Sequence, residues 1–173
     1  MKQVFIGLGS NIGERLENLR AAVQHLAALP ETKVMKVSGV YESEPLGFTE
    51  QENFFNAVCE LETALQPEDL FLRLKQIEHL MGRPEQYERW HPRVIDLDIL
   101  LYGSRIVETP MLTVPHAEMH DRKFVLVPLS ELADPVHPKF QKPVSQLLGE
   151  TSDTSMLTRR QILNIDGTNG RNT

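Results

Sequence analysis

The sequence predicts an α+β fold: a ferredoxin-like antiparallel sheet with a βαββαβ core and extra C-terminal helices. Apolar residues recur with the period of a strand in some segments and with the period of a helix in others. Along the chain these segments follow the order strand, helix, strand, strand, helix, strand. This is the order of the split βαβ unit, which carries its helices on one face of the sheet and leaves the other face available.

Size and composition favour one domain. With 173 residues and 40% hydrophobic content, the chain is long enough to bury one core and too short for two. We interpret residues 1–150 as that domain. Residues 151–173 are polar, and we expect a C-terminal tail that is partly disordered, above all in its final DGTNGRNT.

The first two strands and the helix between them are predicted near the N-terminus. Gln3–Leu8 has the pattern of a strand. Residues at helical spacing predict the helix that follows, with Asn11 or a nearby glycine as its start signal: Leu16, Leu19, Val23 and Leu26. Val34–Tyr41 predicts the second strand, and Glu44–Glu52 predicts a loop.

The third strand is predicted at Asn53–Glu62, where Phe55, Ala57, Cys59 and Leu61 share one face. Pro67 then predicts the start of a helix and Gly82 its end, because proline suits the first helical turn and glycine the position after the last. The apolar face of this helix is predicted at Leu70, Leu74, Ile77 and Met81. The fourth strand follows and continues as far as Tyr102.

The remaining segments are shorter. The chain turns at Gly103 and Ser104, with extended pieces around Ile106 and Leu112–Val114. A helix is predicted to start near Asp121, to include Phe124, Leu126 and Leu129, and to be interrupted or ended at Pro128. A second short helix is predicted at Val144–Leu148. We expect these helices to cover part of the second face of the sheet.

Two carboxylates, Asp96 and Asp98, interrupt the otherwise apolar fourth strand. Side chains alternate along a strand, so both acids point to the same face with their bases roughly 7 Å apart. Carboxylates in an apolar strand cost free energy unless a cation or hydrogen-bond donors meet them. A half-exposed strand with one polar face would give the same alternation. The residues just upstream favour the functional interpretation: Arg83, Arg89 and Arg93.

This combination predicts a magnesium site that faces an anionic, phosphate-bearing substrate. Mg²⁺ takes one or two carboxylates from a protein, keeps some waters and fills the rest of its shell with phosphate oxygens. The net charge of the chain is -6, which argues against a general nucleic-acid binder. An anionic ligand must therefore be attracted by a local concentration of positive charge.

Other classes of function are disfavoured. Gly7, Gly9 and Gly13 do not have the spacing of a dinucleotide-binding loop, and no Walker loop follows a glycine run. The six histidines show no tight zinc-binding spacing, and Cys59 lies in an apolar run where a small buried hydrophobe is expected. The N-terminal apolar run is short for a signal sequence, and no stretch approaches the roughly 18 residues of a spanning helix. We expect a cytoplasmic protein.

Several motifs carry a resemblance to a known family. They are LGSN at Leu8–Asn11, YESEPLG at Tyr41–Gly47, FFNAV at Phe54–Val58, GRPEQYERWHPRVIDLDILLYG at Gly82–Gly103, and LTVPH followed by RKFVLVPL. Over roughly Gln3–Leu148 the chain resembles the 6-hydroxymethyl-7,8-dihydropterin pyrophosphokinases of folate biosynthesis. The pairing of RW-x-PR-x-x-DLD with LTVPH is the most specific part of the resemblance.

The resemblance implies the same ferredoxin-like fold and an enzyme that transfers the pyrophosphoryl group of ATP to the pterin hydroxymethyl group, releasing AMP. It implies two Mg²⁺ ions on Asp96 and Asp98, phosphate clamps at Arg83 and Arg93, and a mobile loop that carries Arg89 and Trp90 over the substrates. It also implies that the partners are small molecules, and we expect a monomer with neither nucleic-acid nor membrane partners.

The resemblance further implies two sets of binding residues. The pterin-binding set is Ser43, Leu46, Phe54, Asn56, Trp90, Asp96 and Phe124. The ATP-binding set is Glu78, Arg83, Trp90, Arg93, Ile99, Thr113, His116 and Arg122. Some positions depart from residues common in the family, including Phe54, where tyrosine is common, and Ala117, where an aromatic residue occurs.

Two rival classes remain open from the sequence. A non-catalytic ligand-binding domain would explain the order of elements but not the acidic pair beside arginines. A magnesium-dependent phosphotransferase that moves only the γ-phosphoryl group of ATP would share the logic of the site and would release ADP.

Overall fold

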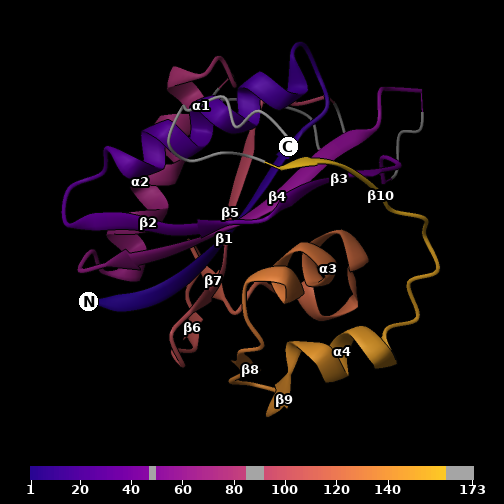
Figure 1. Ribbon diagram of the computed structural model, residues 1–173. Coiled ribbons are helices and arrows are strands. Elements are labelled where there is room, and N and C mark those ends of the chain that lie inside the picture. Colours follow the sequence, from indigo (N-terminus) through magenta and orange to yellow (C-terminus); the bar gives the residue numbers. More distant parts are fainter. Residues whose placement is uncertain (47–49, 85–91, 163–173) are drawn as a thin grey trace, which may run out of the picture.

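An antiparallel sheet forms the middle layer of the fold, with helices on both of its faces (Figure 1). The computed structural model describes residues 1–46, 50–84 and 92–162. Within these ranges six strands make up the main sheet, in the order β10-β3-β4-β1-β5, and β2 pairs with β4. Their bounds are β1 Lys2–Ser10, β2 Thr32–Val37, β3 Gly39–Ser43, β4 Phe54–Thr63, β5 Asp96–Tyr102 and β10 Thr158–Ile162. The antiparallel α/β architecture predicted from the sequence is confirmed.

Two layers of helices enclose the sheet (Figure 1). Helices α1 (Arg15–Ala27) and α2 (Pro67–Leu80) lie on one face. On the other face lie α3 (Lys123–Leu132), α4 (Val144–Glu150) and the 3-10 turn η1 (Met119–Asp121). Two small hairpins complete the described part of the chain: β6 (Val107–Glu108) with β7 (Thr113–Val114), and β8 (Val136–His137) with β9 (Lys142–Pro143).

The hydrophobic core is divided by the sheet into two clusters. The larger one packs the apolar faces of α1 and α2 on the sheet, with Leu19, Leu26, Leu70 and Leu74 fully buried. Helices of this length are marginal in isolation, so burial of the apolar face stabilises them. The predicted period-two alternation places Ala57, Cys59 and Leu61 of β4 in this cluster and Val58 in the smaller cluster with α3 and α4.

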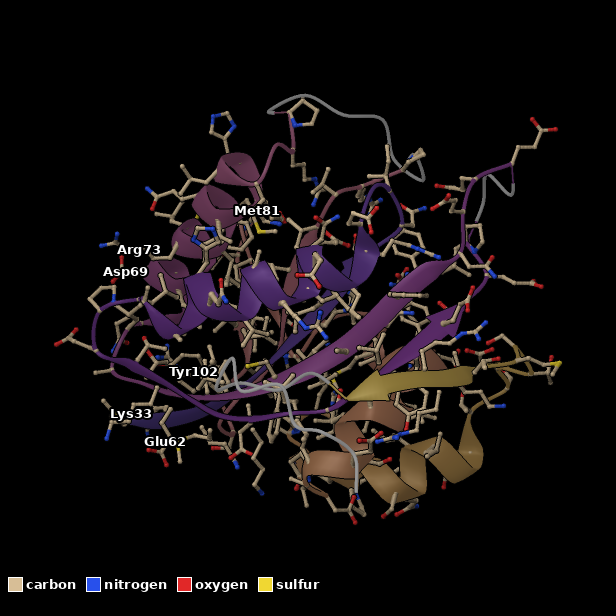
Figure 2. All side chains as sticks on the ribbon, turned by 45° about the horizontal axis from the view of Figure 1, so that its top comes forward. Lys33, Glu62, Asp69, Arg73, Met81 and Tyr102 are labelled. Carbon is tan, nitrogen blue, oxygen red and sulfur yellow. The ribbon has the colours of Figure 1, made fainter. Side chains whose placement is uncertain are left out.

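The β5 strand changes face partway along its length. Its pairing with β1 shifts register between Phe5 and Ile6, so that Leu100 and Leu101 both belong to the α3 side. Tyr102 returns to the α2 side, where its hydroxyl donates to the carbonyl of Leu65 at 2.5 Å (Figure 2). The irregularity follows the two aspartates in sequence, so Asp96 and Asp98 stay in the regular part of the strand.

The predicted second strand, Val34–Tyr41, is two strands in the structure. Lys33 of β2 lies opposite Glu62 of β4 (Figure 2), and Tyr41 of β3 lies opposite Asn56. Between them residues 38–40 face residues 57–58 of β4, so one residue is extra, as in a β-bulge. At the break the Ser38 hydroxyl accepts the Val58 N–H at 2.8 Å, which satisfies a donor that the interrupted ladder would leave open.

The prediction that Pro128 ends the third helix is wrong, because α3 continues through it to Leu132. Proline inside a helix costs roughly 3 kcal/mol. Here Pro128 is itself buried, and Leu126 and Leu129 on the same helix are fully buried against the sheet. Burial of these side chains offsets the cost of the proline.

The polar C-terminal segment contributes to the main sheet, which the sequence did not predict. Strand β10 pairs antiparallel with β3, and the Lys123 N–H donates to Asp153 at 2.9 Å on the way there. The expectation of disorder in DGTNGRNT falls outside the described residues. Among the helices that the structure describes, none has the length and apolar character needed to cross a membrane.

Candidate active site

A pocket opens on the α3 side of the sheet, over β1, β3, β4 and β5. It encloses about 770 Å³ including its mouth, which is within the range of small-molecule sites. Ten of the residues predicted from the sequence line it: Ser43, Leu46, Phe54, Asn56, Arg93, Asp96, Asp98, His116, Arg122 and Phe124. The structure thus brings together residues from β3 to α3 that are more than 80 positions apart in the chain.

The floor of the pocket is formed partly by glycines of β1. Gly7 pairs with Asp98 and Gly9 with Asp96, so β1 places no side chain beside either carboxylate. A Cβ added at Gly9 would lie 3.5 Å from a ring carbon of Phe54 and 3.6 Å from Oδ1 of Asn56. In the sequence these glycines were weighed only against the spacing of a dinucleotide-binding loop. Their spacing of two within a strand, which puts both on one face, was the available signal.

Asp96 is held between two arginines. Its Oδ1 accepts from Arg83 Nη1 at 2.8 Å and its Oδ2 from Arg93 Nη1 at 2.9 Å. Burial alone would raise the pKa of Asp96, but attraction to Arg93 and Arg83 outweighs burial and lowers the pKa below its ordinary value. Asp96 is therefore ionised, and a carboxylate has about four lone-pair sites, so acceptor capacity remains for a cation.

Asp98 has a different environment. Its side chain is 41% exposed, but this exposure opens into the pocket, where His116 Nε2 lies 3.9 Å from Oδ2 of Asp98. Surrounding protein and the neighbouring charge of Asp96 raise the pKa of Asp98 to about 7. A carboxylate destabilised in this way is suited to bind a cation, which would favour its charged form.

In the absence of divalent cations, the free energy of unfolding is expected to fall as pH rises from about 4 to about 7. The folded-state pKa of Asp98 is about 7, above the unfolded value of roughly 3.9. In this window the unfolded chain binds fewer protons at Asp98 than the folded one, so the free energy of unfolding decreases with pH. Other groups titrate too, so denaturant unfolding of the wild type should be compared with Asp98→Asn.

The difference in the free energy of unfolding between the wild type and Asp98→Asn isolates the contribution of Asp98. Adding Mg²⁺ is expected to raise the melting temperature of the wild type more at pH 8 than at pH 5, and to leave Asp98→Asn nearly unchanged. Equal stabilisation of both proteins by Mg²⁺ would contradict the prediction that the Asp98 carboxylate binds the ion.

Two aromatic rings and an amide line the other half of the pocket. Phe54 and Phe124 are half-buried and line it from β4 and α3. Asn56 Nδ2 donates to the Tyr41 carbonyl at 3.1 Å and to Ser43 Oγ at 2.7 Å. These bonds use both amide hydrogens, so Asn56 offers a ligand only its Oδ1 acceptor. The resemblance named Asn56 as a pterin-binding residue, and the structure limits its available polar atom to this acceptor.

His116 and Arg122 line the pocket on the side of Asp98. His116 Nδ1 accepts from the Glu118 N–H at 3.2 Å, which leaves the proton on Nε2, toward Asp98. Burial and the charge of Arg122 lower the pKa of His116, so it is neutral near pH 7 and acts as a donor. Arg122 pairs with Glu118 and lies 5.5 Å from the ring centre of Phe124.

Four predicted residues with described positions do not line this pocket. Arg83 and Glu78 lie behind Asp96, where Glu78 is 2% exposed and accepts from Arg83 and from Lys75. Burial raises the pKa of Glu78 in spite of these cations. Ile99 belongs to the core on the α2 side, and Thr113 lines a smaller hollow that also contains His116. The role of these four residues in ATP binding stays a prediction. Two further predicted residues, Arg89 and Trp90, lie outside the described residues.

Within residues 1–46, 50–84 and 92–162, no group of three or more His, Cys, Asp or Glu side chains could hold a metal ion by itself. The site offers a pair of carboxylates instead. This fits Mg²⁺ bound partly by substrate phosphates better than a closed protein cage. In the same ranges the Nε–H of Arg93 is buried without an acceptor, and a phosphate oxygen would supply one.

Comparison with known proteins gives a consistent result. The family described as 7,8-dihydro-6-hydroxymethylpterin-pyrophosphokinase (HPPK) matches residues 5–134. Proteins named 2-amino-4-hydroxy-6-hydroxymethyldihydropteridine pyrophosphokinase are similar to the chain. The one from Aquifex aeolicus is 39% identical over 153 residues, covering 88% of this chain and 94% of the relative. The one from Pseudomonas aeruginosa is 45% identical over 133 residues, covering 77% and 82%.

The fold also matches solved structures. A crystal structure of Plasmodium falciparum HPPK-DHPS has a TM-score of 0.65 and 15% identity, and the match covers 87% of this chain. The chain spans less than half of that longer protein, at 43%. At this identity the likeness concerns the fold alone.

Proposed function

The chain belongs to the 7,8-dihydro-6-hydroxymethylpterin-pyrophosphokinase (HPPK) family and is a pyrophosphokinase, a transferase of folate synthesis; from this premise we propose its substrates and mechanism. The enzyme transfers the pyrophosphoryl group of ATP to 6-hydroxymethyl-7,8-dihydropterin and releases AMP. The observation that carries the proposal is that one pocket contains both the carboxylates of Asp96 and Asp98 and an aromatic slot. Phe54, Phe124 and Asn56 line that slot.

The pterin occupies the slot between Phe54 and Phe124. Stacking between aromatic rings suits a flat heterocycle. Because the Asn56 nitrogen is committed to Tyr41 and Ser43, Oδ1 accepts from an N–H on the pterin rim. The Ser43 hydroxyl accepts from Asn56 and keeps its own proton to donate. At this edge the site therefore binds one donor of the ligand through Asn56 Oδ1 and one acceptor through the Ser43 hydroxyl.

The triphosphate of ATP lies toward the arginines. Arg93 and Arg122, with neutral His116, concentrate donors at one wall of the pocket in a chain whose net charge is -6. Arg83 adds positive charge from behind Asp96. Asp96 and Asp98 would hold two Mg²⁺ ions. The bound metal would neutralise phosphate charge and lower the pKa of the substrate hydroxyl. When phosphate enters, the buried Nε–H of Arg93 gains an acceptor.

Transfer is a direct displacement without a covalent enzyme intermediate. The pterin hydroxymethyl oxygen forms a bond to the β-phosphorus as the bond to the α-phosphate oxygen breaks and AMP leaves. The hydroxyl proton passes to an aspartate or to water. Arg93 and Arg83 stabilise the developing negative charge, and the pocket supplies orientation, so catalysis is mainly positional and electrostatic.

The architecture is proposed to be ferredoxin-like with residues 1–150 as one domain. Support comes from the strand order: if β2 and β3 are taken as one interrupted strand, the sheet order is fourth, first, third, second in the βαββαβ core. We also propose that the enzyme acts as a monomer in the cytoplasm, where ATP is available.

Incubation with ATP, Mg²⁺ and 6-hydroxymethyl-7,8-dihydropterin is expected to give AMP in proportion to the pterin consumed, and no ADP. Nucleotide chromatography measures both products. The controls are a sample without pterin and the Asp98→Ala variant, neither of which should form AMP.

The other outcomes identify the rival functions. Pterin-dependent ADP would mean that only the γ-phosphoryl group moves. Binding of pterin by calorimetry without any nucleotide turnover would identify a ligand-binding domain.

A further inference from the structure

Asn11 lies at the end of β1, directly after Ser10, and its side chain is enclosed by two segments that are distant in sequence. It is 1% exposed and does not line the pocket. In the sequence it was considered as a helix start signal and as the end of the LGSN motif, but α1 begins at Arg15 and has no side-chain cap. A buried amide at this place needs another explanation, because burial of a polar group is costly unless its hydrogen bonds are made.

The first segment that Asn11 holds is residue 93. Its Oδ1 accepts the Arg93 N–H at 2.7 Å, and its own N–H donates to the Arg93 carbonyl at 3.0 Å. Both main-chain polar groups of Arg93 are therefore fixed by one residue. The Arg93 guanidinium extends from this point to Asp96 at 2.9 Å. The position of the arginine relative to the aspartate depends on this anchor.

The second segment leads into β4. Asn11 Nδ2 donates to Gln51 Oε1 at 2.7 Å and to the Glu52 carbonyl at 3.2 Å. Two residues later the chain reaches Phe54 and then Asn56, which line the proposed pterin slot. This side has a further anchor, since Arg15 donates to the Asn53 carbonyl at 2.8 Å and lies 4.0 Å from the ring centre of Phe55.

We propose that Asn11 is a positioning residue that couples the segment before the pterin slot to Arg93, so that the occupied slot holds the arginine in place for transfer. The inference rests on the proposed function. Arg15 supports the pterin side independently, whereas both main-chain hydrogen bonds of Arg93 go to Asn11. Loss of the Asn11 side chain frees the Arg93 N–H, so it displaces Arg93 more than it disturbs the slot.

Asn11→Ala is expected to lower kcat about 10- to 100-fold, the range for loss of a few hydrogen bonds, while the KM for pterin rises only a few-fold. In an Arg93→Ala background the same change is expected to have little further effect on kcat, because its effect passes through Arg93. Asn11→Asp keeps the acceptor for the Arg93 N–H and loses the donors to residues 51–52. Because this variant still holds the Arg93 N–H but no longer links it to the slot segment, it should lower kcat less than Asn11→Ala does and raise the KM for pterin.

Asn18→Ala is the matched control. Asn18 Nδ2 donates to Ser10 Oγ at 3.1 Å and to the Ile12 carbonyl at 2.9 Å, so it makes comparable bonds in the same connection without reaching Arg93 or Gln51. It should lose stability and keep kcat. If Asn18→Ala lowers kcat as much as Asn11→Ala, or if the Asn11 effect persists fully beside Arg93→Ala, Asn11 has only a structural role and the inference is overturned.

A binding measurement separates this inference from the proposed function. Pterin is expected to slow hydrogen exchange of the Arg93 N–H in the wild type at least several-fold, and to have little effect on it in Asn11→Ala. This readout needs pterin binding and no turnover. Equal slowing in both proteins would overturn the coupling, whereas absence of AMP formation with the exchange effect intact would overturn only the proposed reaction.

Discussion

Replacing Asp98 with alanine is expected to lower kcat by at least about a thousandfold, because a metal-assisted transfer loses one of its two carboxylate ligands. The fold should remain intact. Since surrounding protein and Asp96 raise the pKa of Asp98 to about 7, its charge does not stabilise the folded state at neutral pH without a cation. The measurement is AMP formation by the purified variant, with circular dichroism and a melting curve taken in the absence of Mg²⁺.

Asp96→Ala provides the contrast. It should lose turnover to a similar extent, but it leaves Arg83 and Arg93 without the carboxylate that both contact. These guanidiniums are 6% and 18% exposed, and removal of one partner of a buried pair typically costs about 3–5 kcal/mol. Asp96→Ala should therefore melt lower than Asp98→Ala. Near-normal turnover in either variant would refute the metal assignment.

Asn56→Ala is expected to weaken pterin binding about 10- to 100-fold, because the variant leaves a ligand donor without its acceptor in a buried slot. The truncation also removes the donors to the Tyr41 carbonyl and Ser43 Oγ. ATP binding should stay the same, since the hydrogen bonds of Asn56 go to Tyr41 and Ser43 and not to Arg93 or Arg122. Calorimetric titration with each ligand separates the two affinities.

Asn53→Ala is a suitable control for this experiment. Asn53 precedes the same strand and donates to Glu42 at 3.3 Å, and it does not line the pocket. Its pterin affinity should remain within a few-fold of the wild type. A parallel loss of ATP and pterin affinity in Asn56→Ala would point to general damage of the sheet instead of a lost ligand contact.

The shared face of Asp96 and Asp98 could be predicted because it depends only on local geometry. Alternation along a strand placed Asp96 and Asp98 together whatever their surroundings, and the pocket contains both. The helices on the α2 side followed in the same way from their apolar spacing and from Pro67. For these elements the local pattern and the packed structure agree.

Other features depend on contacts between distant residues and have no local signature. The break at Ser38 arises because its hydroxyl satisfies Val58 on another strand. Helix α3 passes through Pro128 because burial outweighs the local preference. The donors of Asn56 are directed by Tyr41 and Ser43, so the sequence could name the amide but not the atom that remains for a ligand.

The absence of a side chain at Gly9, on the floor of the pocket, has a consequence for inhibitors that would compete with the pterin. A methyl group there would meet Phe54 and Asn56 at ordinary contact distances, so a Gly9→Ala variant should fold without a clash. With the pterin in the proposed slot between Phe54 and Phe124, the same methyl would fill space that the substrate needs as much as a drug does. Mutational escape through this position would therefore sacrifice the substrate, and compounds that rest directly on the glycine would exploit a part of the enzyme with little freedom to evolve resistance.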